Sequence, residues 1–214
     1  MQSTGSDPVT KPVAMGEQAL EGELALPEAP RGVVVFAHGS GSSRFSPRNN
    51  AVAEALRERG LGTLLFDLLT EQEAADRNNV FDIPLLADRV AEAVRWTRSD
   101  EDAGSLPIGL FGASTGAAAA LVAAAKLTDE IAAVVSRGGR PDLAKEALSR
   151  VHAPTLLIVG GADHGVIELN EAARDQMNCE KRLEIVPGAT HLFEEPGTLE
   201  AVMEHAGDWF TAHF

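Results

Sequence analysis

The sequence has a single cysteine and no apolar run long enough to cross a membrane. One cysteine, Cys179, excludes an internal disulfide framework in this chain of 214 residues. The longest unbroken apolar run, residues 117–125, is far shorter than the ~20 residues that span a bilayer. The opening residues, MQSTGSDPVTKPV, have neither the basic nor the apolar part of a secretory signal. We therefore expect a cytoplasmic protein with no membrane partner.

Basic residues are also scarce. The chain has 18 lysines and arginines against 32 aspartates and glutamates, for a net charge of −14. Such a chain repels phosphates, which argues against nucleic acid as a partner. The histidines show no metal-ligand spacing with carboxylates or with Cys179, so we expect no metal site. Nor does any glycine-rich loop carry the Gly-Lys-Ser/Thr ending of a phosphate loop.

The length and composition fit one globular domain. Hydrophobic residues make up 44% and charged residues 23% of the chain, close to soluble averages. Residues 1–12 are polar, contain two prolines and show no periodicity, so we expect a flexible tail there. We assign residues 13–214 to a single domain. The sequence carries no indication of oligomeric state.

Strand-like and helix-like segments alternate along this domain. Short β-branched runs predict strands buried on both faces, and longer amphipathic segments predict the helices between them. After one or two edge strands within residues 13–26, the expected strands are 33–37, 63–66, 107–111, 131–135, 155–159 and 183–186. The expected helices are 51–59, 84–98, 115–127, 141–150, 168–177 and 199–214. This alternation predicts an α/β fold with a mostly parallel sheet and helices on both faces.

The strongest chemical motif is Gly112-Ala113-Ser114-Thr115-Gly116, between an expected strand and an expected helix. In G-x-S-x-G the serine occupies a sharp strand-to-helix turn that exposes its hydroxyl above the sheet. The flanking glycines avoid collisions of a Cβ with the neighbouring strand and helix. We interpret Ser114 as a catalytic nucleophile. The alternative is a serine that only caps the helix.

Two later loops supply a base and an acid for Ser114. Asp163 follows the expected strand 155–159, and His191 follows the strand 183–186. In an architecture with such an elbow the expected chain order is serine, acid, histidine, and strand carboxyl ends are where open α/β sheets place their sites. Glu168 is the rival acid. His164, beside Asp163, is expected to line the site or face solvent.

The loop His38-Gly39-Ser40-Gly41-Ser42-Ser43 directly follows the strand 33–37. A glycine-rich turn there leaves backbone N–H groups free to stabilise a developing negative charge. We assign oxyanion donors to the N–H groups of Ser40 and Thr115, and a loop-bracing role to His38. The alternative is a flexible Ser/Gly loop.

Four arginines follow strands at the same edge: Arg44, Arg48, Arg137 and Arg140. They could form a local site for a carboxylate or phosphate of the substrate in an otherwise acidic protein. The competing interpretation, which we favour slightly, is salt bridging to nearby acids such as Asp67, Asp142 or Asp163.

Four motifs in this order, HGSGSS, GASTG, GGAD and GATHLF, give the chain its resemblance to a known family. From about residue 16 to residue 214 it resembles the α/β-hydrolases, and among them the small dienelactone hydrolase-like members. The resemblance implies an eight-stranded, mostly parallel sheet and cofactor-free hydrolysis of ester or lactone bonds. Dienelactone-cleaving members have a cysteine at the elbow and an arginine soon after the histidine. Here the elbow residue is Ser114, and Leu192 follows His191.

The sequence thus predicts a serine hydrolase acting on small, short-chain carboxylic esters. Residues 70–81 are polar and too few for a large lid, which favours an open cleft and small soluble substrates. An amidase, thioesterase or acyltransferase with the same triad stays open, because the triad activates serine in all of them. A non-catalytic interaction module on this fold is the alternative from another class.

Overall fold

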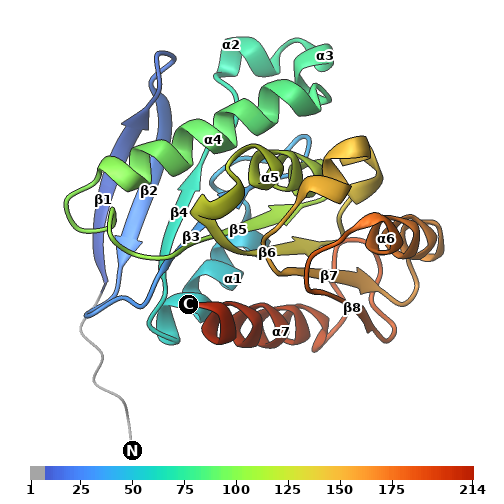
Figure 1. Cartoon of the computed structure of the whole chain (residues 1–214). Coiled ribbons are helices and arrows are strands. Elements are labelled where there is room, and N and C mark those ends of the chain that lie inside the picture. The colour runs from blue at the N-terminus through green and yellow to red at the C-terminus, as the bar shows by residue number, and fades with distance from the viewer. Residues whose placement is uncertain (1–7) are drawn as a thin grey trace, which may run out of the picture.

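A computed structural model describes residues 8–214, which fold around one eight-stranded sheet (Figure 1). Its order is β1-β2-β4-β3-β5-β6-β7-β8, with β1 and β2 antiparallel to their neighbours and the other pairs parallel. The strands are β1 (Val9–Met15), β2 (Leu20–Leu26), β3 (Val33–Ala37), β4 (Gly62–Phe66), β5 (Ile108–Ala113), β6 (Ile131–Arg137), β7 (Thr155–Gly160) and β8 (Lys181–Val186). The predicted fold class is confirmed.

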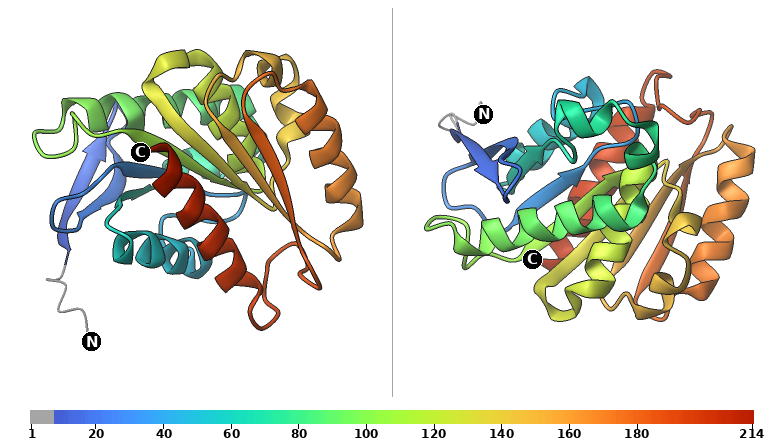
Figure 2. Two further views of the ribbon diagram at one scale, coloured as in Figure 1. Left: turned by 60° about the horizontal axis from the view of Figure 1, so that its bottom comes forward. Right: turned by 90° about the horizontal axis from the view of Figure 1, so that it is seen from above.

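Helices cover both faces of the sheet, as Figure 2 shows in two further views. On one face lie α1 (Pro47–Glu58) and α7 (Thr198–His213). On the other lie α4 (Ile83–Ser99), α5 (Thr115–Lys126), α6 (His164–Gln176) and the 3-10 segment η2 (Pro141–Arg150). Two short helices, α2 (Glu71–Ala74) and α3 (Arg77–Val80), and a 3-10 turn, η1 (Thr128–Glu130), complete the described chain. In that part of the chain no helix is long and apolar enough to span a bilayer.

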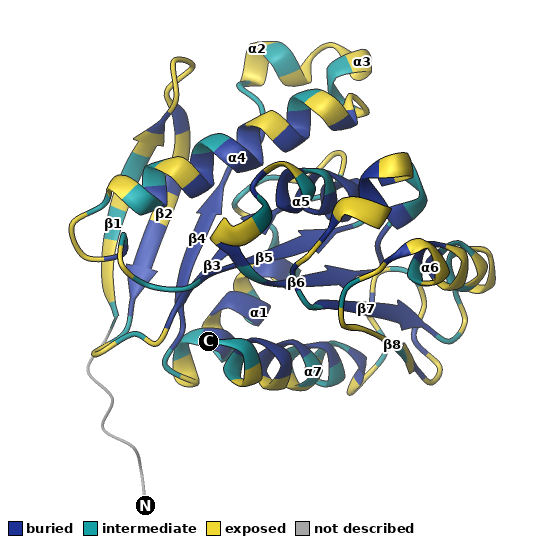
Figure 3. Cartoon of the chain, in the orientation of Figure 1, coloured by how far each residue is buried: buried dark blue, intermediate teal, exposed yellow. Residues whose placement is uncertain are grey.

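The alternation of side chains along each strand divides the core into two layers. In β3, Val33 and Val35 pack toward α4 and α5, whereas Val34 and Phe36 pack toward α1 and α7. The central strands are therefore buried over almost their whole length, and exposed residues concentrate on the outer helix faces, the loops and the edge strands (Figure 3). This double burial explains the continuous apolar runs in the sequence.

Helix α5 is built largely from alanine. Four consecutive alanines, residues 117–120, are fully buried between the sheet, α4 and η2. Small side chains let the helix axis approach the strands closely, so the helix N-terminus is brought to the carboxyl end of β5.

Several element boundaries differ from those expected. The predicted tail through residue 12 is wrong for residues 9–12, which pair with β2 as part of β1, while residues 1–7 lie outside the described residues. Helix α1 begins at Pro47, because Ser46 caps it and proline suits the first helical position. Segment η2 is a 3-10 helix broken by a left-handed residue, Lys145, where an α-helix was expected.

The core beneath the elbow gives a test of packing. The rings of Phe36 and Phe111 lie 4.9 Å apart, centroid to centroid, and both are buried. We expect Phe111→Ala to lower the free energy of unfolding by about 3–5 kcal/mol, because it removes transfer energy and leaves a cavity. Phe81→Ala, at a side chain that is 47% exposed, should change it by no more than about 0.5 kcal/mol. Urea unfolding measures both, and equal losses would contradict this packing.

Candidate active site

Ser114 occupies a strained turn between β5 and α5. Its φ of 51° and ψ of −121° lie outside the regions that most residues adopt. It holds the N-cap position of α5, yet its side chain makes no capping hydrogen bond. The hydroxyl is therefore not used to cap the helix, contrary to the alternative interpretation of the motif. A strained, uncapped serine at this edge is consistent with a nucleophile elbow.

The two glycines of the elbow are required by close approach. A Cβ on Gly112 would overlap backbone atoms of Ala117 in α5. A Cβ on Gly116 would overlap the carbonyl oxygens of Ala37 and His38. The two glycines therefore allow α5 to pack tightly between β5 and the loop after β3.

His191 and Asp163 meet at the carboxyl ends of β7 and β8. His191 Nδ1 lies 2.6 Å from Asp163 Oδ2. An ionised carboxylate only accepts, so Nδ1 carries the proton and Nε2 of the neutral ring is left as an acceptor. Asp163 is the N-cap residue of α6 but does not cap it, because its carboxylate turns to His191. The rival acid, Glu168, is exposed and lies one turn into α6. His164, the first residue of this helix, is exposed as well.

Ser114 and His191 line the same small cavity of about 260 Å³. The loop after β3 forms one wall, and the start of α1, the ends of β5 and β6 and the loop after β8 form the others. Its lining residues are Gly39, Ser40, Ser42, Ser46, Arg48, Asn49, Ala113, Ser114, Arg137, Gly138, His191 and Leu192. Among residues 8–214, no three His, Cys, Asp or Glu side chains are grouped so that they could hold a metal ion.

His38 holds the loop that follows β3. Its Nδ1 donates to the carbonyl of Gly39 at 3.0 Å, and its Nε2 accepts the N–H of Leu68 at 3.1 Å. Burial lowers the pKa of His38, which favours the neutral ring that these two bonds need. The bonds match the bracing role expected for this histidine.

The sequence predicted a free N–H at Ser40, but the structure shows that this N–H is bonded. It donates to Oγ1 of Thr115 at 2.9 Å, which ties the loop after β3 to the first residue of α5. The Thr115 side chain therefore occupies one of the two donors assigned to an oxyanion hole. Sequence alone could not show this bond, because it joins residues 75 positions apart.

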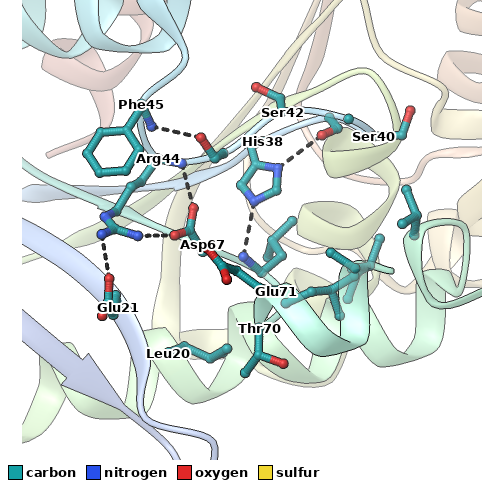
Figure 4. A pocket seen from close by; sticks show the side chains of 18 of the residues that line it. Leu20, Glu21, His38, Ser40, Ser42, Arg44, Phe45, Asp67, Thr70 and Glu71 are labelled. Atoms are coloured by element: carbon teal, nitrogen blue, oxygen red, sulfur yellow. Dashed lines mark hydrogen bonds and ion pairs between the residues drawn. The ribbon is translucent and has the colours of Figure 1, made fainter. Parts of the chain in front are cut away.

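The loop after β3 also lines a larger cavity of about 540 Å³ (Figure 4). Leu20, Leu68 and Leu86 supply apolar lining, and residues of α2 and α3 also border it. Residues 70–81 thus fold into two short helices beside this cavity. Arg44 lines it too, paired with Asp67 and Glu21.

The four candidate arginines do not come together. Arg44 and Arg140 are paired with Asp67 and Asp142, as the salt-bridge interpretation predicted, and neither lines the small cavity. Arg48 and Arg137 do line it. Arg48 pairs with the exposed Glu194 at 3.2 Å.

Arg137 and Asn49 form a buried polar pair that sequence reasoning missed. Arg137 is 6% exposed, and its Nη2 donates to Asn49 Oδ1 at 3.0 Å. Burial, together with the charge of Arg48, lowers the pKa of Arg137 to about 10. Asn49 shares the buried face of α1 with Val52, Ala53 and Leu56, so a polar residue at core spacing was the available signal.

The strand order and the elbow at Ser114 define an α/β-hydrolase fold. The sequence model of the dienelactone hydrolase family matches residues 20–212. The chain therefore belongs to the dienelactone hydrolase family, a family of hydrolases.

Individual proteins similar to this chain were also found. The crystal structure of a dienelactone hydrolase from Anabaena variabilis is 52% identical, with a TM-score of 0.94 over 98% of this chain and 100% of that one. The Est1E structure from Butyrivibrio proteoclasticus shares the fold at 17% identity, with a TM-score of 0.78 over 97% of this chain and 99% of its own. Proteins from two strains of Mycobacterium tuberculosis, provisionally named phosphoribosyl transferases, are 59% identical over 94% of this chain. The matched region is only 45% of their length.

Gly138 provides a test of the geometry around His191. Its φ is +52°, and a Cβ there would lie 3.0 Å from the carbonyl oxygen of His191. We expect Gly138→Ala to slow fluorophosphonate labelling of Ser114 roughly 10- to 100-fold, because small displacements of reacting groups are costly. Gly60→Ala is the matched control, with a φ of +79° and open space around the Cβ.

Both glycine variants should lose stability from the left-handed backbone. Only Gly138→Ala should lose labelling rate, measured on protein that is folded by circular dichroism. Equal labelling of the two variants would show that the His191 loop tolerates the added carbon.

Proposed function

We propose that this protein is a serine hydrolase that cleaves small, short-chain carboxylic esters through an acyl-enzyme. The observation that carries the proposal is the shared cavity of Ser114 and His191, with Asp163 hydrogen-bonded to the far side of the imidazole. A nucleophile, a base and an orienting acid are the groups that acyl transfer requires.

In the first half-reaction, Ser114 Oγ attacks the ester carbonyl while its proton passes to His191 Nε2. The tetrahedral adduct collapses when the bond to the leaving oxygen breaks, and His191 returns the proton to the departing alcohol. Asp163 keeps the proton on Nδ1 and stabilises the imidazolium. In the second half-reaction, His191 takes a proton from water, hydroxide attacks the acyl carbon, and the proton returns to Ser114 Oγ as the acid leaves.

The N–H groups of Thr115 and Ser40 are the proposed donors to the oxyanion. The positive end of the α5 dipole adds to their field. Because Ser40 N–H donates to Thr115 Oγ1 in the free protein, the substrate oxygen must replace that hydroxyl as the acceptor. We expect a rotation of the Thr115 side chain to permit this exchange.

The cavity volume and the family support a small ester over other acyl donors. The volume of about 260 Å³ lies slightly below the usual range for ligand pockets, which suits a short acyl group. Amides and thioesters would use the same residues. Turnover rates measured on esters, amides and thioesters of rising acyl-chain length distinguish these activities. The mycobacterial name belongs to proteins more than twice this length, and the site described here supports acyl chemistry instead.

The nucleophile is tested by Ser114→Ala, which should lower kcat/KM for a short-chain ester by about 10⁴- to 10⁶-fold, because the acyl-enzyme cannot form. Fluorophosphonate labelling, read by mass spectrometry, should disappear as well. Cys179→Ser is the control, since burial raises the pKa of this thiol and it does not line the small cavity. Activity retained without Ser114, or lost without Cys179, would contradict the proposed nucleophile. A wild-type protein that is never labelled would favour a non-catalytic module.

The acid is tested by a pair of isosteric variants. We expect Asp163→Asn to slow turnover by roughly 10⁴-fold, because an amide can hold the imidazole in the wrong tautomer. Glu168→Gln removes a carboxylate from the same helix and should change the rate less than about 2-fold. Steady-state hydrolysis of one ester measures both variants. The reverse ranking would move the acid to Glu168.

A further inference from the structure

Strand β8 forms one edge of the sheet. It pairs with β7 on its inner side, and no other strand of residues 8–214 pairs with its outer side (Figure 1). Lys181 and Arg182 are exposed, and the apolar residue Ile185 is 44% exposed. An exposed edge strand is a template for pairing with another chain, so natural proteins usually cover or interrupt such a strand.

The opposite edge of the sheet is interrupted in this way. Strand β1 contains Pro12, which has no N–H to donate to a further strand. Its neighbour Lys11 pairs with Asp100 at 2.6 Å. Strand β8 contains no proline. The two edges therefore differ, and β8 is the edge whose backbone can accept another strand.

The backbone directions in β8 follow from its hydrogen bonds to β7. The N–H groups of Thr155 and Gly161 donate to the carbonyl groups of Glu180 and Val186. Successive residues of a strand direct their backbone groups to opposite sides, so the even-numbered residues from 180 to 186 face β7. The N–H and C=O groups of the odd-numbered residues 181, 183 and 185 therefore point outward.

A second copy of β8 complements this edge in one register. When two β8 strands run antiparallel about a two-fold axis at Leu183, Leu183 faces its own copy and Lys181 faces Ile185. The outward backbone groups of these three residues then form the hydrogen-bonded pairs of the ladder. In the same register Arg182 of each copy lies opposite Glu184 of the other.

Charge distinguishes this register from its neighbours. A shift by two residues in one direction would place Glu184 opposite Glu184, and a shift in the other direction would place Arg182 opposite Arg182. Opposite charges across a ladder stabilise the pairing, whereas like charges directly opposite destabilise it. The order of charges along β8 therefore favours the two-fold axis at Leu183.

The charged side chains of β8 are already arranged on one face. Arg182 Nε lies 2.8 Å from Glu184 Oε1, and the guanidinium lies over the ring of Trp209 in α7. Leu183 and Ile185 therefore lie on the other face, toward α6. Two copies would bring together two arginines and two glutamates, a locally balanced cluster in a chain whose net charge of −14 otherwise makes copies repel.

We propose that β8 is a dimerisation edge, at which two copies of this chain join their sheets antiparallel about a two-fold axis at Leu183. A two-fold contact of this kind closes on itself, whereas pairing of β8 with β1 would be head-to-tail. The carboxyl ends of the two β8 strands point in opposite directions, so the two cavities that contain Ser114 lie at opposite edges of the joined sheet. The inference is therefore independent of the proposed hydrolase function.

The first experiment exchanges the charges of β8 and measures the oligomeric state by sedimentation velocity over a wide range of concentrations. We expect the wild-type chain to be a dimer that dissociates on dilution. Arg182→Glu alone, or Glu184→Arg alone, places like charges opposite each other at two positions and should raise the Kd of the dimer roughly 10- to 100-fold. The double variant keeps the pairs complementary with the signs exchanged and should restore the dimer.

Mixing the two single variants tests the register directly. One copy then supplies two glutamates and the other two arginines, so the mixture should form a heterodimer although each variant alone is monomeric at the same concentration. Lys126→Glu is the control for net charge, because Lys126 lies on α5 and pairs with the exposed Asp88. It should dimerise like the wild-type chain.

The second experiment tests the backbone ladder. Ile185→Pro removes an outward N–H without removing a bond to β7, and it should abolish the dimer. Ile185→Val keeps the N–H and should dimerise. Hydrogen exchange of the amides in residues 181–186 should slow with rising concentration in the wild-type chain and stay fast in Ile185→Pro, with circular dichroism showing that each variant is folded.

Three results would overturn the proposal. The first is a wild-type chain that stays monomeric over the whole concentration range. The second is a dimer that withstands both Arg182→Glu and Ile185→Pro, since its interface would then lie elsewhere. The third is a wild-type chain that assembles into species larger than the dimer without limit, which would indicate a head-to-tail contact.

Discussion

The left-handed backbone of Ser114 is the constraint on which the arrangement of the site depends. A residue with a side chain pays for a positive φ, so the conformation persists only where packing on both sides enforces it. Here the absence of a side chain at Gly112 leaves room for α5, and its absence at Gly116 leaves room for the loop after β3. The chain turns from strand to helix within one residue, and the hydroxyl is left at the sheet edge instead of in a cap.

The parallel sheet then determines which other groups reach that hydroxyl. β5, β7 and β8 each end at a turn or loop that carries one member of the proposed triad. The loop after β3 carries Ser40, and Arg137 is the last residue of β6. These residues are far apart in the sequence but lie at the same edge, because parallel strands present their carboxyl ends together. The loops can vary in chemistry while the strand register keeps their starting points fixed.

Much of this was accessible from the sequence, and the missing parts have definite physical reasons. Apolar runs predicted the parallel strands, and the elbow glycines predicted the turn at Ser114. The triad order brought Asp163 and His191 to one place, where the structure joins them by a hydrogen bond. The failures are interactions that local patterns do not encode. Residues 9–12 belong to an edge strand because they pair with β2. The side-chain oxygen of Thr115 accepts a hydrogen bond from the N–H of Ser40, which lies in a different loop.

The arginines show the same limit. Their charge and position after strands suggested one cluster, yet nearby carboxylates neutralise Arg44 and Arg140. Burial separates Arg137 from the others, and burial depends on α1, whose start at Pro47 places Asn49 against the guanidinium. Ser46 and Pro47 indicate the start of α1 in the sequence. The contact between Asn49 and Arg137 that results from this start is visible only in the structure.

The alanine-rich helix α5 also has an entropic consequence. Alanine has no rotamers to lose on burial, so the segment 117–120 orders without the cost that longer side chains incur. The helix that aims its N-terminus at Ser114 thus has almost no side-chain degrees of freedom through which its packing could relax. Its dipole and the Thr115 N–H therefore keep their direction before any ligand arrives, so the reorganisation that the proposed reaction needs is confined to the Thr115 side chain.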